Sequence, residues 1–419
     1  MKTIMEIGKA AKMAAYKLAT ATTEQKNQAL LNMAEELEVN YDDIMEANTL
    51  DMANAMGNNK PQAFLDRLML TEERIKGMAA GLRALVDLPD PIGTVDRTWT
   101  AAQEIEVQKV RVPMGVIGII YEARPNVTAD GAGICLKTGN AVILRGGSDA
   151  INSNLIIGRL LAKGIQDAGL PAESVQVVED TSRETANKMM SLNEYINLLI
   201  PRGGKGLIQS VINTATVPVI ETGAGNCHVF VDETANLKKA VDIIINAKTQ
   251  RPAVCNAIES LLVAEGKAHR ALPVIAESLR KAKVEIRGCE KTVEILKENR
   301  FDVTPATEED YYTEYGSLIL SCKVVKDVYE AVDHINEHGT HHSDCIITED
   351  ETNAKVFQMG VDSAAVYVNA STRFTDGEQF GFGAEIGIST QKLHARGPMG
   401  LEEMTSYKYL VCGDGQIRK

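Results

Sequence analysis

The sequence lacks any surplus of basic residues. It holds 44 Lys and Arg against 57 Asp and Glu, a formal net charge of −13, and a single Trp. Nucleic-acid-binding surfaces usually need a basic stripe, often with aromatic residues between the cations. Because no such stripe stands out, the composition argues against nucleic acid as a partner.

Long hydrophobic runs are also missing. The longest, such as residues 115–120 and 260–264, are far too short to span a bilayer. Residues 1–18 read as an amphipathic helix and contain no continuous apolar core of a secretion signal. We therefore expect a cytoplasmic protein that does not bind a membrane.

The seven cysteines are too scattered to form a recognisable framework. They include no CxxC pair and no Cys/His spacing typical of zinc sites. This pattern argues against a disulfide scaffold and against structural zinc.

What the chain does have is length and a change of pattern along it. Its 419 residues suffice for two or three domains. Residues 1–88 read as helices, with a capping-box signal at Thr22. Residues 98–113 alternate apolar and polar side chains, the period of a half-exposed strand or hairpin. Strands and helices then alternate up to about residue 370, which predicts parallel sheets with crossover helices; a last candidate strand covers residues 405–413.

Residues 112–148 read as a strand, a small-residue helix and a second strand. Ligands of open parallel sheets bind at the carboxyl ends of the strands. Here those ends carry Arg124-Pro125-Asn126 and Arg145-Gly146-Gly147-Ser148. The pattern favours a bound anion; a surface loop with two solvated arginines is the alternative.

A second glycine turn, Arg202-Gly203-Gly204-Lys205, follows an apolar strand and precedes a helix. Glycine allows close backbone approach, and a helix N-terminus favours phosphate. A plain strand-to-helix turn is the alternative. This is not a Walker loop, and Gly223-Ala224-Gly225 lacks the third glycine of a Rossmann fingerprint.

Cys255 is a candidate nucleophile. It lies just before an apolar strand, and Arg251 is four residues away. A thiolate attacks a carbonyl carbon when electropositive surroundings lower its pKa. A buried structural cysteine is the commoner alternative.

Four histidines crowd one segment near Asp344: His334, His338, His341 and His342. Such a cluster suggests a metal site, but strand geometry would point His341 and His342 to opposite faces, which disfavours a shared metal. A polar turn that binds an anionic substrate, and simple solvated histidines, are the alternatives.

Taken in order, these segments resemble the aldehyde dehydrogenase superfamily along nearly the whole chain. The matches are PxGVxG at 113–118, the strand end at Arg145, the glycine turn at 203–204, Glu221 with the glycines after it, Cys255, and FGFG at 380–383. Within that superfamily, residues 325–346 and the tail at 380–400 are similar to the motifs of the gamma-glutamyl phosphate reductases.

The resemblance implies an aldehyde dehydrogenase-like α/β fold, with two Rossmann-like parallel-sheet domains and a small β oligomerisation element. The nucleotide-binding domain is expected to cover 1–97 and 114–228. The catalytic domain, 229–370, would carry Cys255. The oligomerisation element would pair the 98–113 hairpin with a strand of the 371–419 tail.

The implied reaction is the NADPH-dependent reduction of L-glutamyl 5-phosphate to L-glutamate 5-semialdehyde with release of phosphate, the second step of proline biosynthesis. Cys255 occupies the nucleophile position and would form a thioester. By spacing, the superfamily's oxyanion asparagine falls on Arg124, while the nearby asparagine is Asn126, and the choice stays open. Glu221 matches the base that activates water in ordinary aldehyde dehydrogenases, which would waste an acyl phosphate here.

Two other functions are left open. Glu221 favours an ordinary NADP-dependent dehydrogenase that oxidises a semialdehyde to an acid. A catalytically silent binding or structural protein is the third alternative, and intact Cys255, Arg145 and Gly203 argue against it.

The resemblance also implies how NADP(H) is held. Arg145 matches a lysine that contacts the adenosine ribose. Ser148 stands where NAD-dependent members often have a glutamate, and losing that carboxylate favours the 2′-phosphate of NADP. Gly203 and Gly204 match the turn at the pyrophosphate, and Lys205 adds a positive charge.

Local cations are needed to hold an anionic substrate on an acidic protein. The candidates are Arg124, Arg251, His341, His342 and Arg396. No metal is expected. We expect a homo-oligomer and a transient complex with glutamate 5-kinase, because glutamyl phosphate is labile.

Overall fold

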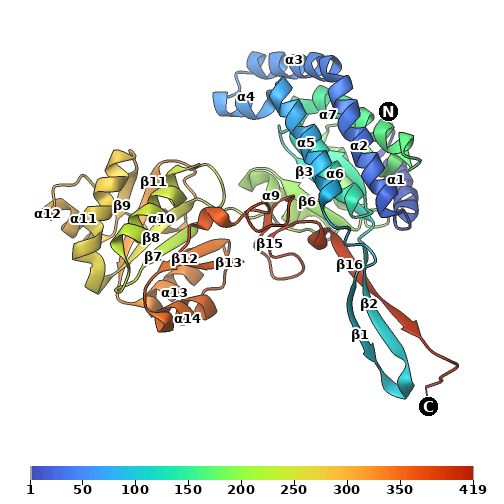
Figure 1. Cartoon of the computed structure of the whole chain (residues 1–419). Coiled ribbons are helices and arrows are strands. Elements are labelled where there is room, and N and C mark those ends of the chain that lie inside the picture. Colours follow the sequence, from blue (N-terminus) through green and yellow to red (C-terminus); the bar gives the residue numbers. More distant parts are fainter. Residues whose placement is uncertain (1, 419) are drawn as a thin grey trace. The chain divides into compact units, whose positions relative to one another are not determined.

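The computed structural model describes residues 2–418, apart from the side chains of Ala63 and Lys205. It divides into two compact units, each an α/β body with its own parallel sheet (Figure 1). Unit 1 comprises Met1–Thr222, Phe382–Gly387 and Met399–Lys419, and unit 2 comprises Gly223–Gly381 and Ile388–Pro398. The predicted α/β class is confirmed.

Unit 1 opens with the helices that the sequence predicts. They are α1 (Ile4–Leu18), α2 (Thr23–Val39), α3 (Tyr41–Gly57), α4 (Gln62–Leu68) and α5 (Glu72–Asp87). Thr22 and Gln25 form the predicted capping box at the start of α2, in which each side chain bonds the other's backbone N–H. Thr71 caps α5 by accepting a hydrogen bond from the Arg74 N–H.

The parallel sheet of unit 1 has the strand order β5-β4-β3-β6. Its elements are β3 (Val116–Tyr121), α6 (Asn126–Lys137), β4 (Ala141–Arg145), α7 (Ile151–Asp167), β5 (Val175–Val177), α8 (Arg183–Met190), β6 (Leu198–Arg202) and α9 (Lys205–Thr214). The chain runs outward from β3 through β4 to β5 and returns to β6 beside β3. This reversal makes the carboxyl ends of β3 and β6 a topological switch point, where open α/β sheets bind ligands.

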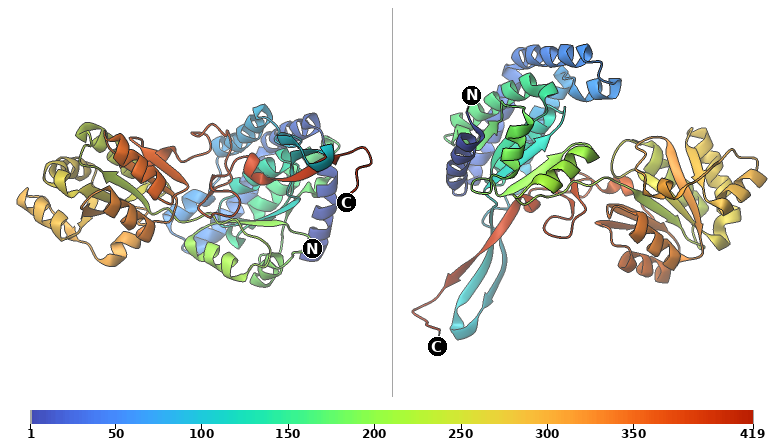
Figure 2. Two further views of the ribbon diagram at one scale, coloured as in Figure 1. Left: turned by 90° about the horizontal axis from the view of Figure 1, so that it is seen from below. Right: turned by 180° about the vertical axis from the view of Figure 1, so that it is seen from behind.

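A separate antiparallel ribbon belongs to unit 1. It joins β1 (Val95–Thr100), β2 (Glu106–Pro113) and β16 (Thr405–Cys412) in the order β1-β2-β16, so the segments expected to pair do pair. The ribbon extends away from the helices of unit 1, with the C-terminus near its tip (Figure 2). Its outer strands β1 and β16 are exposed at almost every position.

The sheet of unit 2 has seven parallel strands in the order β10-β9-β11-β8-β7-β12-β13. Its strands are β7 (Cys227–Val231), β8 (Ile258–Ala264), β9 (Glu285–Gly288), β10 (Thr304–Pro305), β11 (Ile319–Val325), β12 (Ser343–Ile347) and β13 (Ala365–Val368), and β14 (Ile388–Ser389) pairs with β15 (Gly397–Pro398) outside the sheet. The helices are α10 (Leu237–Thr249), α11 (Glu265–Lys281), α12 (Glu290–Glu298), α13 (Val328–His338) and α14 (Glu351–Gly360).

Two hydrophobic cores lie on the two faces of this sheet. Val229 and Val231 of β7 join a core with α10, α11 and α12, while Phe230 between them joins one with α13 and α14. Successive strand residues point to opposite faces, so a strand that is covered on both faces buries every side chain. All residues of β7 and β8 are buried, including the polar His228, Glu259 and Ser260.

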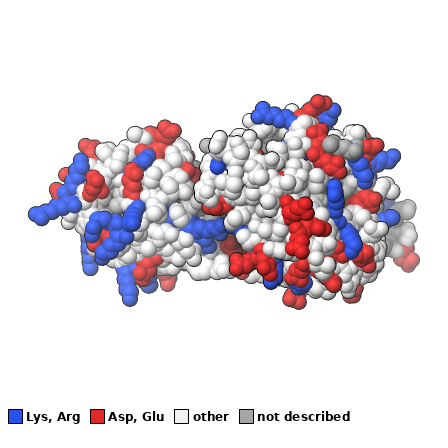
Figure 3. Space-filling view, turned by 90° about the horizontal axis from the view of Figure 1, so that it is seen from above, with Lys and Arg blue, Asp and Glu red and all other residues white. Residues whose placement is uncertain are grey.

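The surface carries mixed charge. Basic and acidic side chains are interspersed on the face of each unit shown in Figure 3, and no continuous basic band crosses that face. Within residues 2–418, every helix is too short or too polar to cross a membrane.

Candidate functional site

Cys255 lies on the turn that leads into β8, at the amino-terminal edge of the sheet of unit 2. The thiol is half-buried. Gly225, just before β7, passes directly behind it, and a Cβ built on Gly225 would lie 1.6 Å from the Cys255 carbonyl oxygen. Only glycine allows this approach. The Cys227 thiol donates a hydrogen bond to the same carbonyl oxygen at 3.1 Å, which ties the turn to the start of β7.

The position of Cys255 differs from the general rule for parallel sheets. Ligands usually bind at the carboxyl ends of the strands, yet Cys255 precedes its strand, as do Gly225 and His342. The loops before β7, β8 and β12 meet because these strands are neighbours in the sheet. The nucleophile candidate is therefore surrounded by loops that enter the sheet.

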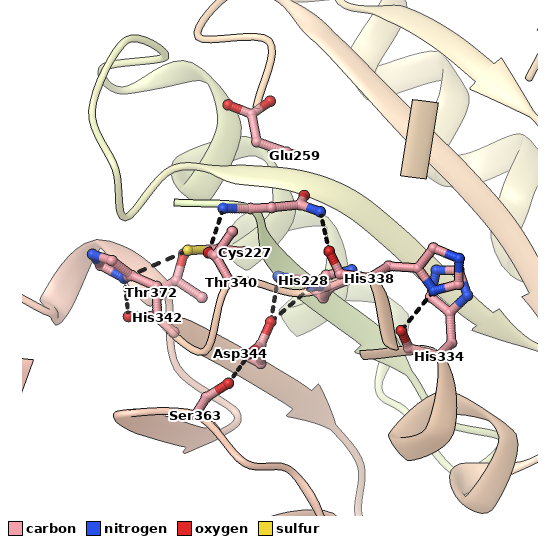
Figure 4. Close-up of polar contacts among 12 residues, drawn as sticks. Cys227, His228, Glu259, His334, His338, Thr340, His342, Asp344, Ser363 and Thr372 are labelled. Carbon is pink, nitrogen blue, oxygen red and sulfur yellow. Dashed lines mark hydrogen bonds and ion pairs between the residues drawn. The ribbon is translucent and has the colours of Figure 1, made fainter. Parts of the chain in front are cut away.

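A buried polar network lies beneath this edge (Figure 4). Asp344 Oδ1 accepts hydrogen bonds from the backbone N–H of His228 at 2.7 Å and from His228 Nδ1 at 2.9 Å. Ser363 Oγ donates to the other carboxylate oxygen. Both His228 and Asp344 are fully buried, so these bonds compensate for the lost solvation of the carboxylate.

The histidines of α13 belong to the same buried region. His334 and His338 stack with ring centroids 4.0 Å apart, and His338 Nε2 is 2.8 Å from Glu308 Oε1. Burial lowers the pKa of His334 far below its usual value, so the ring is neutral. Among residues 2–418, no group of three or more His, Cys, Asp and Glu is placed to hold a metal ion.

His341 and His342 have different surroundings, and the prediction that both lie on a strand is wrong. Both precede β12, and the chain turns at His341, whose backbone is left-handed (φ 60°). Its Nδ1 is 2.7 Å from the Asp362 carbonyl oxygen, and its side chain is exposed. His342 is fully buried, with Nδ1 2.8 Å from Ser343 Oγ, and burial lowers its pKa to about 4.

Arg396 lies beside His341 rather than in a separate pocket. Its Nη2 donates to the carbonyl and to the carboxylate of Asp362, both at 2.9 Å. Lys392 also pairs with Asp362, at 2.7 Å. Arg251 is exposed at the start of the turn that carries Cys255. Substrate contacts of these cations remain predictions.

The glycine turn of unit 1 lies at the switch point between β3 and β6. Tyr121 and Arg202 are register partners there, and the Gly204 N–H donates to Glu122 Oε2 at 3.2 Å. A Cβ on Gly203 would clash with Glu122 and Leu207. Gly204 is the N-cap of α9, so the N–H groups of the first helical turn lie at this edge. The side chain of Lys205 lies outside what the structure describes.

Arg145 ends β4 next to this edge. Its Nη2 donates to the Thr181 carbonyl at 2.6 Å, while Nε is buried and unpartnered within residues 2–418. Burial lowers the pKa of Arg145, and nearby Asp180 partly offsets the effect. Ser148, at the start of a short 3-10 turn, is exposed. A half-buried cation fits an anionic group of a nucleotide.

The remaining predicted residues of unit 1 are accessible. Asn126 starts α6, and its side-chain amide donates to Asp130 at 2.9 Å. Arg124 is exposed, with its backbone N–H bonded to the Glu122 carbonyl at 2.7 Å. Glu221 is half-buried. These three residues belong to unit 1 and Cys255 to unit 2, and their proposed roles remain predictions.

Sequence reasoning singled out Asp344 but missed its partner His228, and it missed Arg373. His228 and Asp344 lie 116 positions apart and meet only through the register of β7 and β12. Arg373, in a 3-10 turn, bonds Gln250 from 123 positions away. A local motif gives no signal for such pairs. His228 within the otherwise apolar strand β7 is the one hint that a polar group is buried there.

Comparison with known proteins identifies the family of the chain. The sequence model of the aldehyde dehydrogenase family matches residues 2–295. The chain is 58% identical over 411 residues to a gamma-glutamyl phosphate reductase of Caldanaerobacter subterraneus subsp. tengcongensis, with 98% of each chain covered. It is 58% identical over 418 residues to one from Clostridium botulinum (strain Eklund 17B / Type B), with both chains covered completely.

Comparison with solved structures identifies the same family. The crystal structure of gamma-glutamyl phosphate reductase from Thermotoga maritima matches with a TM-score of 0.97 and 51% identity, covering 100% of both chains. The chain belongs to the aldehyde dehydrogenase family and, within it, to the gamma-glutamyl phosphate reductases.

Proposed function

We propose that this protein reduces L-glutamyl 5-phosphate to L-glutamate 5-semialdehyde with NADPH and releases phosphate, as the second step of proline biosynthesis. The observation that carries the proposal is the Cys255 turn, which Gly225 and Cys227 support from behind. The full-length similarity to enzymes named gamma-glutamyl phosphate reductase supports the choice of substrate.

Cys255 acts as the nucleophile. Its thiolate sulfur attacks the acyl carbon, the S–C bond forms, and the C–O bond to phosphate breaks with its electron pair leaving on the phosphate oxygen. The oxyanion of the tetrahedral intermediate needs a hydrogen-bond donor, and the backbone N–H of Cys255 would serve as one. When bound, NADPH supplies the hydride that takes the thioester to the oxidation level of the aldehyde.

The residues at the switch point of unit 1 fit a dinucleotide. Gly203 and Gly204 let a pyrophosphate approach the start of α9, and the unused Arg145 Nε fits a 2′-phosphate. Ser148 adds no negative charge beside it. These features favour NADP(H) over NAD(H).

We also infer a homo-oligomer that forms through the β1-β2-β16 ribbon. Tyr407, Tyr409 and Val411 are exposed on β16, which is an edge strand. An exposed edge with large apolar side chains is a ready template for pairing with another chain. A transient complex with glutamate 5-kinase stays a prediction.

The test compares cysteine variants in the reverse direction, with semialdehyde, phosphate and NADP⁺. Cys255→Ala and Cys255→Ser should abolish phosphate-dependent oxidation while circular dichroism shows an intact fold. Cys412→Ser, at an exposed cysteine, is the matched control and should stay active. If Cys255→Ala kept most of the turnover, the covalent mechanism would be wrong. Oxidation to free glutamate without phosphate would instead identify an ordinary semialdehyde dehydrogenase.

A further inference from the structure

Arg373 forms hydrogen bonds with residues on both sides of Cys255. Its Nε donates to Gln250 Oε1 at 3.0 Å, and Gln250 ends α10 just before the turn. On the other side, Asn256 Nδ2 donates to the Arg373 carbonyl at 3.5 Å. The 3-10 turn Thr372–Phe374 therefore cannot shift without moving the residues on either side of Cys255.

Two further hydrogen bonds fix this contact. Asn256 Nδ2 also donates to the Thr375 carbonyl at 2.9 Å, and Thr372 Oγ1 donates to the Asn256 carbonyl at 2.7 Å. Thr372 and Thr375 are both fully buried. Because these bonds are buried, they hold the backbone of Arg373 more firmly than exposed loop contacts would.

The Arg373 side chain lies beside the Cys255 turn, because its Nε is bonded to Gln250, five residues before the cysteine. Burial lowers the pKa of Arg373, and the charge of a Cys255 thiolate would oppose this effect. The positive charge of Arg251 lowers the pKa of Arg373 further, so two cations share this side of the turn. Asp376 and Cys227 raise that pKa and partly offset the effect of Arg251. Within residues 2–418, neither terminal nitrogen of Arg373 forms a hydrogen bond or an ion pair.

We propose that Arg373 binds the phosphoryl group of the acyl phosphate while Cys255 displaces it. This inference rests on the proposed function and assigns a residue to its leaving group. As the S–C bond forms and the C–O bond breaks, the electron pair leaves on phosphate, whose oxygens accept hydrogen bonds from the two terminal nitrogens. The Gln250 bond holds the guanidinium at Nε and leaves its outer edge free for bidentate contact.

The phosphoryl group is favoured over the carboxylate of the substrate by distance along the molecule. The phosphoryl oxygen is attached to the carbon that Cys255 attacks. The α-carboxylate is separated from that carbon by three carbon atoms. Arg373 is bonded to Gln250 and Asn256, which flank the Cys255 turn, so this cation is held next to the residue that attacks the reacting carbon.

The kinetic test varies phosphate in the reverse reaction of the full-length enzyme. Arg373→Gln should raise the KM for phosphate about ten- to a hundredfold, since a hydrogen bond to a charged group is lost. The KM for semialdehyde should stay within about twofold. Arg373→Lys, which keeps the charge but not the fork, should be intermediate. Arg280→Gln, at an exposed arginine of α11, is the control and should match wild type.

A second arm separates phosphate binding from positioning of the turn. Gln250→Ala removes the bond to Nε but keeps the cation, so its KM for phosphate should rise less than that of Arg373→Gln. An equal rise would overturn the proposal and make Arg373 a positioning residue. A rise confined to the KM for semialdehyde would overturn it in favour of the carboxylate.

A third arm needs no turnover. Alkylation of Cys255 by iodoacetamide, followed by mass spectrometry of its peptide, should be slowed by inorganic phosphate in the wild type and not in Arg373→Gln. Protection in a protein that fails to reduce glutamyl phosphate would uphold the anion site and refute only the proposed reaction. Absence of protection in an active wild type would refute the role of Arg373.

Discussion

His228 and Asp344 are register partners on neighbouring strands and form a buried pair. The Nδ1–Oδ1 distance is 2.9 Å, and the same carboxylate oxygen accepts the His228 backbone N–H at 2.7 Å. The pair ties β7, which follows Gly225, to β12, which follows the two histidines at 341 and 342. It therefore fixes the edge of the sheet on which the Cys255 turn lies.

Asp344→Asn should destabilise the protein by roughly 1–3 kcal/mol, because an amide has one acceptor oxygen where the carboxylate accepts three hydrogen bonds. Urea unfolding gives the free energy. Asp333→Asn, on the exposed face of α13, should change it by less than about 0.5 kcal/mol. If the two substitutions changed the free energy of unfolding equally, the buried pair would add no more stability than an exposed carboxylate.

Lys248 and Glu259 form a second buried pair, 2.5 Å apart and fully excluded from solvent. Burial raises the pKa of Glu259 to about 7 and Lys248 opposes this. Lys248→Met should cost about 3–5 kcal/mol by leaving a buried acid alone, whereas Lys248→Met with Glu259→Leu should recover most of that loss. A double-mutant cycle from chemical unfolding measures the coupling; additive losses would contradict it.

His342 should make stability depend on pH. Its folded-state pKa is about 4, below the ordinary value of 6.5, so the unfolded chain binds more protons between these values. Stability should thus stay constant above pH 6.5 and fall as pH drops from about 6.5 to 4. At pH 5 the loss of unfolding free energy, relative to pH 7.5, should be roughly 2 kcal/mol. His342→Gln should lower the difference in unfolding free energy between pH 7.5 and pH 5. His269→Gln, at an exposed histidine, should leave it unchanged.

Arg145→Gln should remove most of a preference for NADPH over NADH. A charge-assisted bond to a 2′-phosphate is worth about ten- to a hundredfold in kcat/KM. The ratio of kcat/KM for the two cofactors is the measurement, and Arg83→Gln, an exposed arginine of α5, is the control. Equal efficiency with both cofactors in the wild type would refute the assignment.

His341→Asn should raise the KM for semialdehyde or phosphate several-fold with the KM for NADP⁺ unchanged, because His341 is exposed beside Arg396. Its melting temperature should stay near that of wild type. His342→Asn, at a buried position, should instead lower the melting temperature. Unchanged substrate constants in His341→Asn, or a stoichiometric metal in the purified protein, would rule out the substrate contact.

Local signals in the sequence determined much of this protein. The capping box at Thr22, the apolar strands around residues 116–121 and 141–145, and the glycine turn at 203–204 depend on neighbours a few positions away, so they can be read from the chain. The motifs around Cys255 and the tail likewise predicted the family, which the comparisons confirmed.

Only the tertiary structure decided which distant residues meet. Asp344 reaches His228 through strand register, and Arg373 reaches Gln250 because the chain returns to the Cys255 turn after β13. The same packing separated His341 from His342, one exposed and one buried. Non-local contacts arise from strand order and helix packing, and a single sequence carries no local record of either.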